Sequence, residues 1–405
     1  MIKAISHNSL EMNQSTILDT ANTTLGENQQ VIITKRAQIC QIFGETYDRD
    51  RWNDWRWQMR HRLTKLEHFQ SLLQLTPAEE RGLAIAPDKF AVAVTPHFAS
   101  LLDPQDPLCA LRLQVIPTDT ELLVDPADRV DPCGEDDDSV VPGLVHRYPD
   151  RVLLLALDTC AAYCRYCTRS RLVSQGEMYP LTRRLDAIVA YLEEHTEVRD
   201  VLISGGDPLL MSEEPLDNLL SRLRAIPHIE FIRIGSRVPG FLPQRITPEL
   251  VAILRKHRVW LSLHFCHQRE LTPEVAQACD LLADGGIPLG SQTVLLKGVN
   301  DSEQALKELF HSLLKLRVRP YYLYQCDPVI GTAHLRTTVQ TGIDLISKLR
   351  GHTTGYAVPN YVIDAPGGGG KVPIQTNNLI AYENGKATLR NWEGKTYIYL
   401  DPVES

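Results

Sequence analysis

Several features are missing from this chain of 405 residues, and each absence excludes a class of protein. It has no run of about 18 apolar residues, so no membrane-spanning helix is expected. Positive charge is not in excess, because 42 lysines and arginines stand against 50 acidic residues and give a net charge of −8. A general nucleic-acid binder needs a basic surface, so no nucleic-acid partner is expected. With 43% hydrophobic residues, the chain is also too apolar for global disorder.

The first residues, 1–28, are polar and lack the sequence signals that direct export or import. A secretory signal needs a basic start and an apolar core, and a transit peptide is rich in arginine. We therefore interpret this stretch as a leader without a fixed fold. A cytoplasmic location follows from that interpretation, and in the cytoplasm the nine cysteines are expected to be reduced.

From Arg151 onward, short apolar runs alternate with amphipathic stretches. The apolar runs are 152–157, 201–204, 231–235, 259–264, 288–295 and 320–324. The amphipathic stretches are 185–195, 216–225, 248–257, 273–285, 302–316 and 343–350. Strands rich in Val, Ile and Leu that alternate with helices predict a parallel sheet with right-handed crossovers. Six such units predict an α/β fold, a partial (β/α)6 barrel open on one side, preceded by a helical region.

Polar residues follow each apolar run, where a barrel of this type carries its active site. In chain order they are Cys160, Cys164 and Cys167, then Ser204 to Asp207, Ser236 and Arg237, His264, Gln292, and finally Cys326 and Asp327. If the predicted strands hold, these six groups meet at one mouth of the barrel. The acidic run 135–138 lies before the barrel, and we interpret it as a solvated loop.

The cysteines Cys160, Cys164 and Cys167 have the spacing C-x3-C-x2-C. Structural zinc sites usually need two pairs of ligands, and no second pair accompanies this triplet. Three thiolates can instead hold three irons of a [4Fe–4S] cluster and leave the fourth iron open. The alternative is three structural or redox cysteines. The spacing, directly after the first strand of a barrel, resembles the radical S-adenosylmethionine (SAM) superfamily, in which SAM chelates the open iron.

Two further segments are interpreted beside the triplet. Residues Ser204, Gly205, Gly206 and Asp207 resemble the superfamily segment that meets the amino group of SAM, although Gly-Gly-Asp alone is usually a turn. Asp364-Ala-Pro followed by four glycines and Lys371 is not a P-loop, because a valine follows the lysine. Read alone it could be a surface linker. Beside the triplet it resembles a segment whose lysine forms a Schiff base with pyridoxal phosphate (PLP).

Together the triplet and the glycine-rich lysine segment resemble the lysine 2,3-aminomutases, which are PLP-dependent radical SAM enzymes. The similarity covers residues 52–399. Matching stretches include 52–55, 142–144, 146–151, 160–169, 201–207, 235–237, 242–245, 324–327, 349–352 and 364–371.

The resemblance assigns a role to each matching position. It implies that Cys160, Cys164 and Cys167 bind the cluster and that Lys371 is the catalytic lysine that binds PLP. Arg169 matches the arginine that holds the substrate carboxylate, which suits a planar guanidinium.

The remaining cofactor contacts follow from the same resemblance. Arg147 and Arg151 are the candidates for the PLP phosphate, with exposed surface arginines as the alternative. His264 and Gln292 fall where the family contacts SAM, with polar residues that face the core as the alternative.

Asp327 and Asp364 are the residues that indicate which amino acid is the substrate. In the lysine enzymes, aspartates at these positions hold the ε-ammonium group, whereas glutamate aminomutases do not have both. Two carboxylates repel the side-chain carboxylate of glutamate and favour a cationic tail. Lysine fits first and arginine carries a cation too, so the sequence leaves both open. A helix cap or a solvated loop is the alternative for either aspartate alone.

The predicted function is therefore the transfer of the α-amino group of L-lysine to the β-carbon, giving β-lysine, with a [4Fe–4S] cluster, SAM and PLP as cofactors. The same reaction on L-arginine is the alternative, and an iron–sulfur or radical SAM protein without PLP is the alternative of another class. A one-electron reductant such as flavodoxin or ferredoxin and a homo-oligomer are expected. We divide the chain into a leader (1–50), a helical region (51–150), the barrel (151–330) and a PLP-binding segment (331–405).

The long lysine aminomutases bind zinc through a cysteine-rich tail and one more cysteine after Gly-Val-Asn-Asp. Here Ser302 follows that tetrapeptide, and no cysteine follows Cys326. No structural zinc is therefore predicted.

Overall fold

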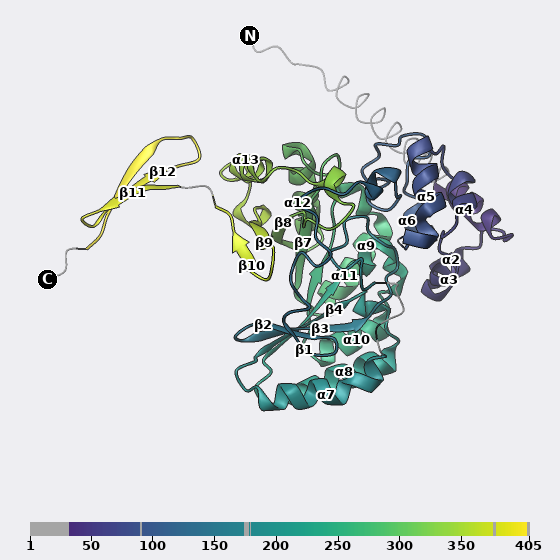
Figure 1. Ribbon diagram of the computed structural model, residues 1–405, viewed down its shortest axis with the longest axis horizontal. Helices are drawn as coiled ribbons and strands as arrows, with labels where there is room; N and C mark the ends of the chain where they lie inside the picture. Colours follow the sequence, from purple (N-terminus) through teal and green to yellow (C-terminus); the bar gives the residue numbers. More distant parts are fainter. Residues whose placement is uncertain (1–31, 90, 174–177, 179, 376–377, 403–405) are drawn as a thin grey trace, which may run out of the picture.

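A ten-stranded sheet, with its strands in the order β1 to β10, organises the chain (Figure 1). The computed structural model describes residues 32–402 apart from 90, 174–177, 179 and 376–377. Most of the predicted leader lies outside these residues. The six predicted strands are β3 (Arg151–Leu157), β4 (Asp200–Gly205), β5 (Phe231–Ser236), β6 (Trp260–Leu263), β7 (Leu289–Leu295) and β8 (Arg319–Gln325). Each pairs in parallel with the next, which confirms the predicted partial barrel.

The sheet extends beyond the six predicted strands at both ends. On one side, β1 (Ser139–Val141) and β2 (Leu144–Tyr148) add an antiparallel ribbon to β3. On the other side, β9 (Asn360–Ala365) pairs in parallel with β8, and β10 (Gly370–Pro373) pairs antiparallel with β9. The glycine-rich lysine segment is therefore a hairpin at one end of the barrel sheet.

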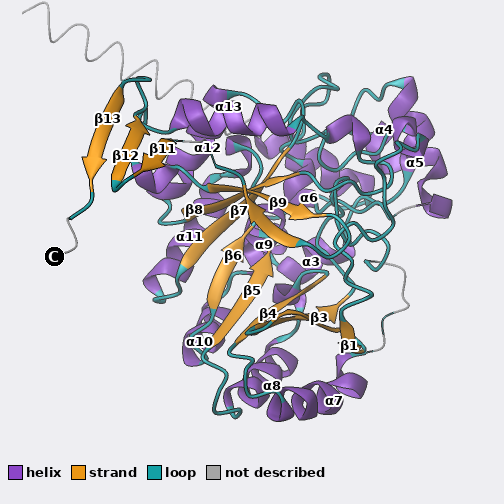
Figure 2. Ribbon diagram, turned by 60° about the vertical axis from the view of Figure 1, so that its left-hand side comes forward, coloured by secondary structure: helices purple, strands orange, loops and turns teal. Residues whose placement is uncertain are grey.

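Six helices cover the outer face of the barrel (Figure 2). They are α7 (Leu181–Glu194), α8 (Glu213–Arg224), α10 (Pro248–Lys256), α11 (Pro273–Asp284), α12 (Glu303–Lys315) and α13 (Val339–Leu349). The last four begin at a Thr or Ser whose side chain accepts a hydrogen bond from a backbone amide of the first turn, which satisfies a donor that the helix leaves free. In α8, four leucines spaced three and four residues apart turn one face to the sheet.

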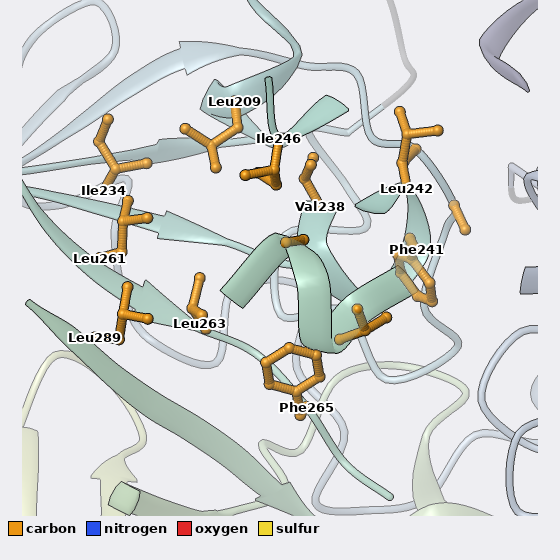
Figure 3. Packing of buried hydrophobic residues seen from close by; sticks show 14 of the residues in the cluster. Leu209, Ile234, Val238, Phe241, Leu242, Ile246, Leu261, Leu263, Phe265 and Leu289 are labelled. Atoms are coloured by element: carbon orange, nitrogen blue, oxygen red, sulfur yellow. The ribbon is translucent and has the colours of Figure 1, made fainter. Parts of the chain in front are cut away.

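The hydrophobic core lies between this sheet and its helices and continues to the short helix α9 (Val238–Phe241). Figure 3 shows Ile234, Leu261 and Leu289 in a row on neighbouring strands, Val238 of α9 nearer the centre and Phe241 on the far side of α9. Because α9 follows β5 directly, this packing fixes the position of the residues at the end of that strand. The N-terminal helices are α2 (Arg49–Asn53), α3 (Trp55–Arg60), α4 (Leu66–Gln70), α5 (Pro77–Lys89) and α6 (Pro96–Ala99). None of the described helices is long and apolar enough to cross a bilayer.

A second sheet stands apart from the body of the molecule (Figure 1). It consists of the antiparallel strands β11 (Leu379–Glu383), β12 (Lys386–Arg390) and β13 (Thr396–Leu400). Every residue of β11 and β13 is exposed, and Ala387 is the buried residue of β12. The exposed side chains include Leu379, Ile380, Tyr382, Leu389, Tyr397, Ile398, Tyr399 and Leu400. This C-terminal sheet thus has apolar side chains without a core of its own.

Candidate active site

The three cysteines of the triplet lie on the loop that follows β3, and each is half-buried. Burial raises the pKa of Cys160, and the neighbouring thiols raise it further. Burial and the charge of Cys164 likewise raise the pKa of Cys167 to about 11. The three sulfur atoms are therefore near enough to interact electrostatically, as ligands of one group must be.

The donor set on this loop fits an iron–sulfur cluster. Across residues 32–402 with their gaps, no three His, Cys, Asp or Glu side chains form a group that could hold a single metal ion. A cluster does not require such convergence, because each thiolate binds a different iron. Thiolates are also the ligands that iron–sulfur clusters use, so the chemistry of the loop matches this cofactor.

Residues from the ends of β5 and β6 meet the cysteine loop. The buried guanidinium of Arg237 donates a hydrogen bond to Cys164 Sγ at 2.8 Å and also contacts the hydroxyl of Tyr166. The same hydroxyl lies 2.9 Å from Nε2 of His264. Burial and the positive charge of Arg237 hold the pKa of His264 well below its usual range, so this imidazole is neutral.

The segment after β4 packs against the same loop. A Cβ on Gly206 would stand 2.2 Å from the carbonyl oxygen of Thr159, and Gly205 has a φ of +118°. Only glycine permits this close approach. The carboxylate of Asp207 accepts hydrogen bonds from the Ser236 hydroxyl and the backbone amides of residues 209, 237 and 238. The described contacts thus give Asp207 the task of fixing the start of α9.

A cavity of about 620 Å³ runs along the inside of the barrel. It touches Ser204, Gly235 and Tyr324 near the ends of their strands and Gln292 in the middle of β7. It also touches strand beginnings at Asp200, Arg233, Trp260 and Arg319. Arg147, Arg151, Arg169, Asp364 and Lys371 complete the predicted residues along it. None of the three clustered cysteines lines this cavity. Its volume lies in the range of pockets that bind a cofactor and a small substrate.

Lys371 and Asp364 face each other across the β9–β10 hairpin. The Lys371 ammonium donates to Asp364 Oδ2 at 3.2 Å, and its backbone amide donates to the Tyr148 hydroxyl at 2.8 Å. A Cβ on Gly370 would stand 2.7 Å from that hydroxyl, so glycine is required here. Oδ1 of Asp364 is buried without a hydrogen bond. An amine at a cavity beside an unsatisfied buried acceptor fits a site for PLP and an amino acid.

Arg169 forms a paired ion contact that the sequence did not predict. Its Nε and Nη2 donate to the carboxylate of Glu135 at 3.0 and 2.7 Å, and Nη1 lies 3.4 Å from Ser204 Oγ. Burial lowers the pKa of Arg169, but Glu135 more than offsets this and raises it. The interpretation of the run 135–138 as a solvated loop is therefore wrong for Glu135, which is buried.

The other end of that acidic run reaches Arg147. Asp138 accepts a hydrogen bond from Arg147 Nε at 2.6 Å, and Nη1 of Arg147 stands 3.9 Å from Asp364 Oδ1. Arg151 is about half exposed, and its guanidinium lies 4.1 Å from the centre of the Tyr148 ring. Both arginines line the same cavity as Lys371.

Asp327 is held by a hydrogen bond from the Thr168 hydroxyl at 2.7 Å. Burial raises the pKa of Asp327 to about 6, and the neighbouring Asp364 adds to this effect. Lys371 and Arg169 oppose it through their positive charge. Asp364, Lys371 and Arg169 are therefore all close enough to Asp327 to influence its charge. Thr168 was not identified from the sequence, since a lone threonine carries no recognisable signal.

The fold and the cysteine loop define the class of protein. Residues 155–310 match the family model of the radical SAM superfamily. This class implies the cluster and SAM that the triplet predicts.

The particular family follows from longer similarities. Residues 346–405 match the family model described as lysine-2,3-aminomutase. The L-lysine 2,3-aminomutase of Clostridium subterminale is 52% identical over 90% of this chain and 87% of its own length. The L-lysine 2,3-aminomutase of Bacillus subtilis is 48% identical over 87% of this chain and 75% of its own length. The glutamate 2,3-aminomutase of Clostridioides difficile is 37% identical over 91% of this chain and 87% of its own length. The chain belongs to the lysine 2,3-aminomutase family, whose membership implies PLP as well.

Proposed function

We propose that this chain is a 2,3-aminomutase that moves the α-amino group of L-lysine to its β-carbon and gives β-lysine. One observation carries the proposal: Arg169, Asp364 and Lys371 line the same cavity, and Asp327 lies within electrostatic reach of all three. A cation for a carboxylate, an amine for PLP and two carboxylates for a second ammonium are the groups that lysine needs. The similarity to L-lysine 2,3-aminomutases supports this assignment.

The substrate carboxylate is assigned to Arg169. Glu135 occupies the edge formed by Nε and Nη2, so the edge that carries Nη1 remains for a ligand. This arrangement fixes the guanidinium plane before the substrate enters. A preorganised bidentate donor lowers the entropy cost of orienting the substrate.

The side-chain ammonium of the substrate is assigned to Asp327 and Asp364. In the described structure Asp364 accepts from the Lys371 ammonium. If PLP held that amine, Asp364 Oδ2 would be open to the substrate cation, while Oδ1 would keep Arg147 Nη1 at 3.9 Å. The second carboxylate, Asp327, makes this site strongly unfavourable for a substrate with an acidic side chain, because buried carboxylates repel each other.

The cofactors supply the difficult chemistry: when bound, the cluster and SAM provide a carbon radical, and PLP carries the migrating nitrogen. We assign the cluster to Cys160, Cys164 and Cys167, and covalent PLP binding to Lys371. Arg147 and Arg151 are assigned to the phosphate of PLP. Ser204, Gly205, Gly206, Asp207, His264 and Gln292 are assigned to the SAM side of the barrel, where Asp207 acts through the backbone that it fixes.

The protein contributes position and exclusion of water. With the substrate carboxylate on Arg169 and its side-chain ammonium on the two aspartates, both termini of the substrate would be held, which would fix the place of its β-carbon. The cavity walls keep out hydrogen donors that would quench a radical.

We also propose that the enzyme works in the cytoplasm as a homo-oligomer with a one-electron carrier as its reductant. The exposed apolar strands of the C-terminal sheet support an association between copies, because isolated apolar patches of this kind mark interaction surfaces.

The test is anaerobic turnover of the iron-reconstituted protein with PLP, SAM and dithionite. Lysine, arginine, glutamate and alanine are offered in parallel, and β-amino acids are identified by mass spectrometry after derivatisation. β-Lysine alone supports the proposal. β-Arginine alone means that the carboxylate pair reads a guanidinium instead. No product with cluster and PLP both bound contradicts an aminomutase that acts on free amino acids.

A further inference from the structure

Arg237 has no role in the proposed function, although it touches one of the three clustered cysteines. It is the residue that directly follows β5 and precedes α9. Its side chain is only 8% exposed, and Nη1 donates a hydrogen bond to Cys164 Sγ at 2.8 Å. A buried cation is costly unless its surroundings compensate the charge, so the partners of this guanidinium indicate what it does.

The positive charge of Arg237 is only partly compensated by a carboxylate. Within the described residues its ion-pair partner is Glu270, whose Oε2 lies 3.3 Å from Nη2. The other carboxylate oxygen of Glu270 already accepts hydrogen bonds from two backbone amides at 2.9 Å. Nη2 also donates to the side-chain oxygen of Gln114, and Nε has no hydrogen bond in the described structure. The Cys164 sulfur is therefore nearer to the guanidinium than the carboxylate is.

Backbone and ring contacts fix the position of this guanidinium. The backbone amide of Arg237 donates to Asp207 Oδ2 at 2.7 Å, which ties the end of β5 to the segment after β4. The centre of the Phe241 ring lies 4.0 Å from Cζ of Arg237, and the centre of the Tyr166 ring lies 5.5 Å from it. Both rings attract a cation through their faces. The charge is therefore in place before the cysteine loop gains negative charge, and it needs no rearrangement at that moment.

A fixed positive charge on a cysteine sulfur affects the reduction potential of an iron–sulfur cluster. Reduction adds one electron to the cluster, and the thiolates share the added negative charge. Hydrogen bonds to the sulfurs, net charge and solvent exposure set the potential of such clusters. A hydrogen bond from a charged donor is also stronger in a buried site than in water. A charged and buried donor therefore stabilises the reduced form more than the oxidised form.

We propose that Arg237 raises the reduction potential of the [4Fe–4S] cluster through its hydrogen bond to Cys164 Sγ. It is a positioning residue, because it acts on the cluster through this sulfur. The proposal rests on the proposed function, since it needs the cluster on the three clustered cysteines. It also gives the carboxylate of Asp207 a further task, because the backbone amide that Asp207 holds belongs to the residue that donates to the sulfur.

The test is a redox titration of the reconstituted protein with its cluster and PLP, in the absence of SAM. Titanium(III) citrate is added anaerobically with mediators, and the reduced cluster is measured by its electron paramagnetic resonance signal. The variants are Arg237→Gln, which removes the charge, and Arg237→Lys, which keeps it. The matched control is Arg62→Gln, since Arg62 reaches the same loop through the carbonyl oxygen of Cys160, at 2.8 Å.

We expect Arg237→Gln to lower the equilibrium constant for cluster reduction at least tenfold, which is about 59 mV for a one-electron couple. Arg237→Lys and Arg62→Gln should both stay within threefold of the wild type. An unchanged constant in Arg237→Gln, or a loss of equal size in either of the other two variants, overturns the proposal. With a full iron content these results leave the proposed function standing, whereas a wild-type protein that binds no cluster refutes both proposals together.

A second measurement decides the case in which Arg237→Gln does not fold or binds no iron. The wild-type protein is prepared with ¹⁵N-labelled arginine and reduced, and electron–nuclear double resonance detects the nuclei that interact with the cluster. We expect a ¹⁵N coupling, because a guanidinium nitrogen is hydrogen-bonded to a cluster ligand, and we expect Arg237→Lys to lose it. No coupling in the reduced wild type, or a coupling that persists in Arg237→Lys, overturns the proposal.

Discussion

Replacing Asp327 by asparagine should make the ligand-free protein more stable at neutral pH. Burial is the main reason that the pKa of Asp327 is raised from 3.8 to about 6, so the ionised carboxylate is disfavoured in the fold. The raised value means that the folded chain binds the proton more tightly than the unfolded chain. Wild-type stability therefore falls as the pH rises from about 4 to about 6 and is then level. Asparagine does not titrate and can still accept the hydrogen bond of Thr168.

The size of the effect follows from that difference in pKa. About two pH units correspond to about 3 kcal/mol between the two protonation states, and we take about 2 to 3 kcal/mol as the expected gain for Asp327→Asn above pH 7. Below pH 4 the two proteins should be equally stable. For a chain of this size a gain of that order raises Tm by about 5 °C.

The assay is thermal unfolding of cluster-free, PLP-free protein between pH 4 and pH 8, followed by circular dichroism. Asp344→Asn is the matched control, since Asp344 is exposed on α13 and should change the free energy of unfolding by less than about 0.5 kcal/mol. The same Asp327→Asn variant should bind lysine less well, because it loses a charge for the substrate ammonium. A difference in Tm that does not depend on pH, or a loss of stability at pH 7.5, would refute the reasoning.

Three other predictions follow from the site. Glu135→Gln should raise KM for lysine about tenfold with kcat less affected, because Arg169 loses a hydrogen bond to a charged partner worth about 1.5 to 3 kcal/mol. Steady-state kinetics of wild type and variant with equal PLP and iron contents test this. An unchanged KM contradicts the role of Glu135 in positioning Arg169. Lys371→Ala should abolish the absorbance of lysine-bound PLP while iron content stays the same, and a retained band would remove Lys371 from its assigned role. Gly206→Ala should destabilise the protein by about 1 to 3 kcal/mol, because the new Cβ would meet the carbonyl of Thr159 at 2.2 Å. Gly235→Ala, whose Cβ would lie 3.8 Å from its nearest neighbour, is the control in the same thermal assay.

The barrel was predictable because each of its strands contains several apolar residues, most clearly in β3 (RVLLLAL), and these strands alternate with amphipathic helices. The strands that the sequence did not reveal lack a recognisable apolar pattern. Residues 144–148 of β2 include a histidine and an arginine, and β10 begins at a glycine, so neither shows the run of apolar residues that marks a buried strand. Their pairing with the barrel is decided by tertiary contacts.

The spacing of the three cysteines marked the cysteine loop, and the resemblance of the glycine-rich segment marked Lys371; the roles assigned to them stay predictions. Glu135 was not predictable, because its partner Arg169 stands 34 positions away and a run of acids usually faces solvent. Asp207 illustrates the opposite case. The motif marked it as a ligand contact, whereas its carboxylate is occupied by the hydroxyl of Ser236 and by backbone amides. A motif identifies a position but does not distinguish a residue that touches the ligand from one that shapes the backbone around it.

If the C-terminal sheet forms the contact between copies that we propose, the order of its strands depends on the protein concentration. Three short strands whose faces are exposed to solvent gain little free energy from burial. The ring contact of Trp392 with His352 connects this part of the chain to the main body over a small area. If contact with a second copy stabilises these strands, the extent of that stabilisation follows mass action and falls on dilution. Under that proposal, enzyme stored at high concentration and enzyme diluted into a cuvette differ in the folding of their last strands, although the barrel is the same in both. Amide exchange of β11 to β13 measured across a dilution series would record that difference directly.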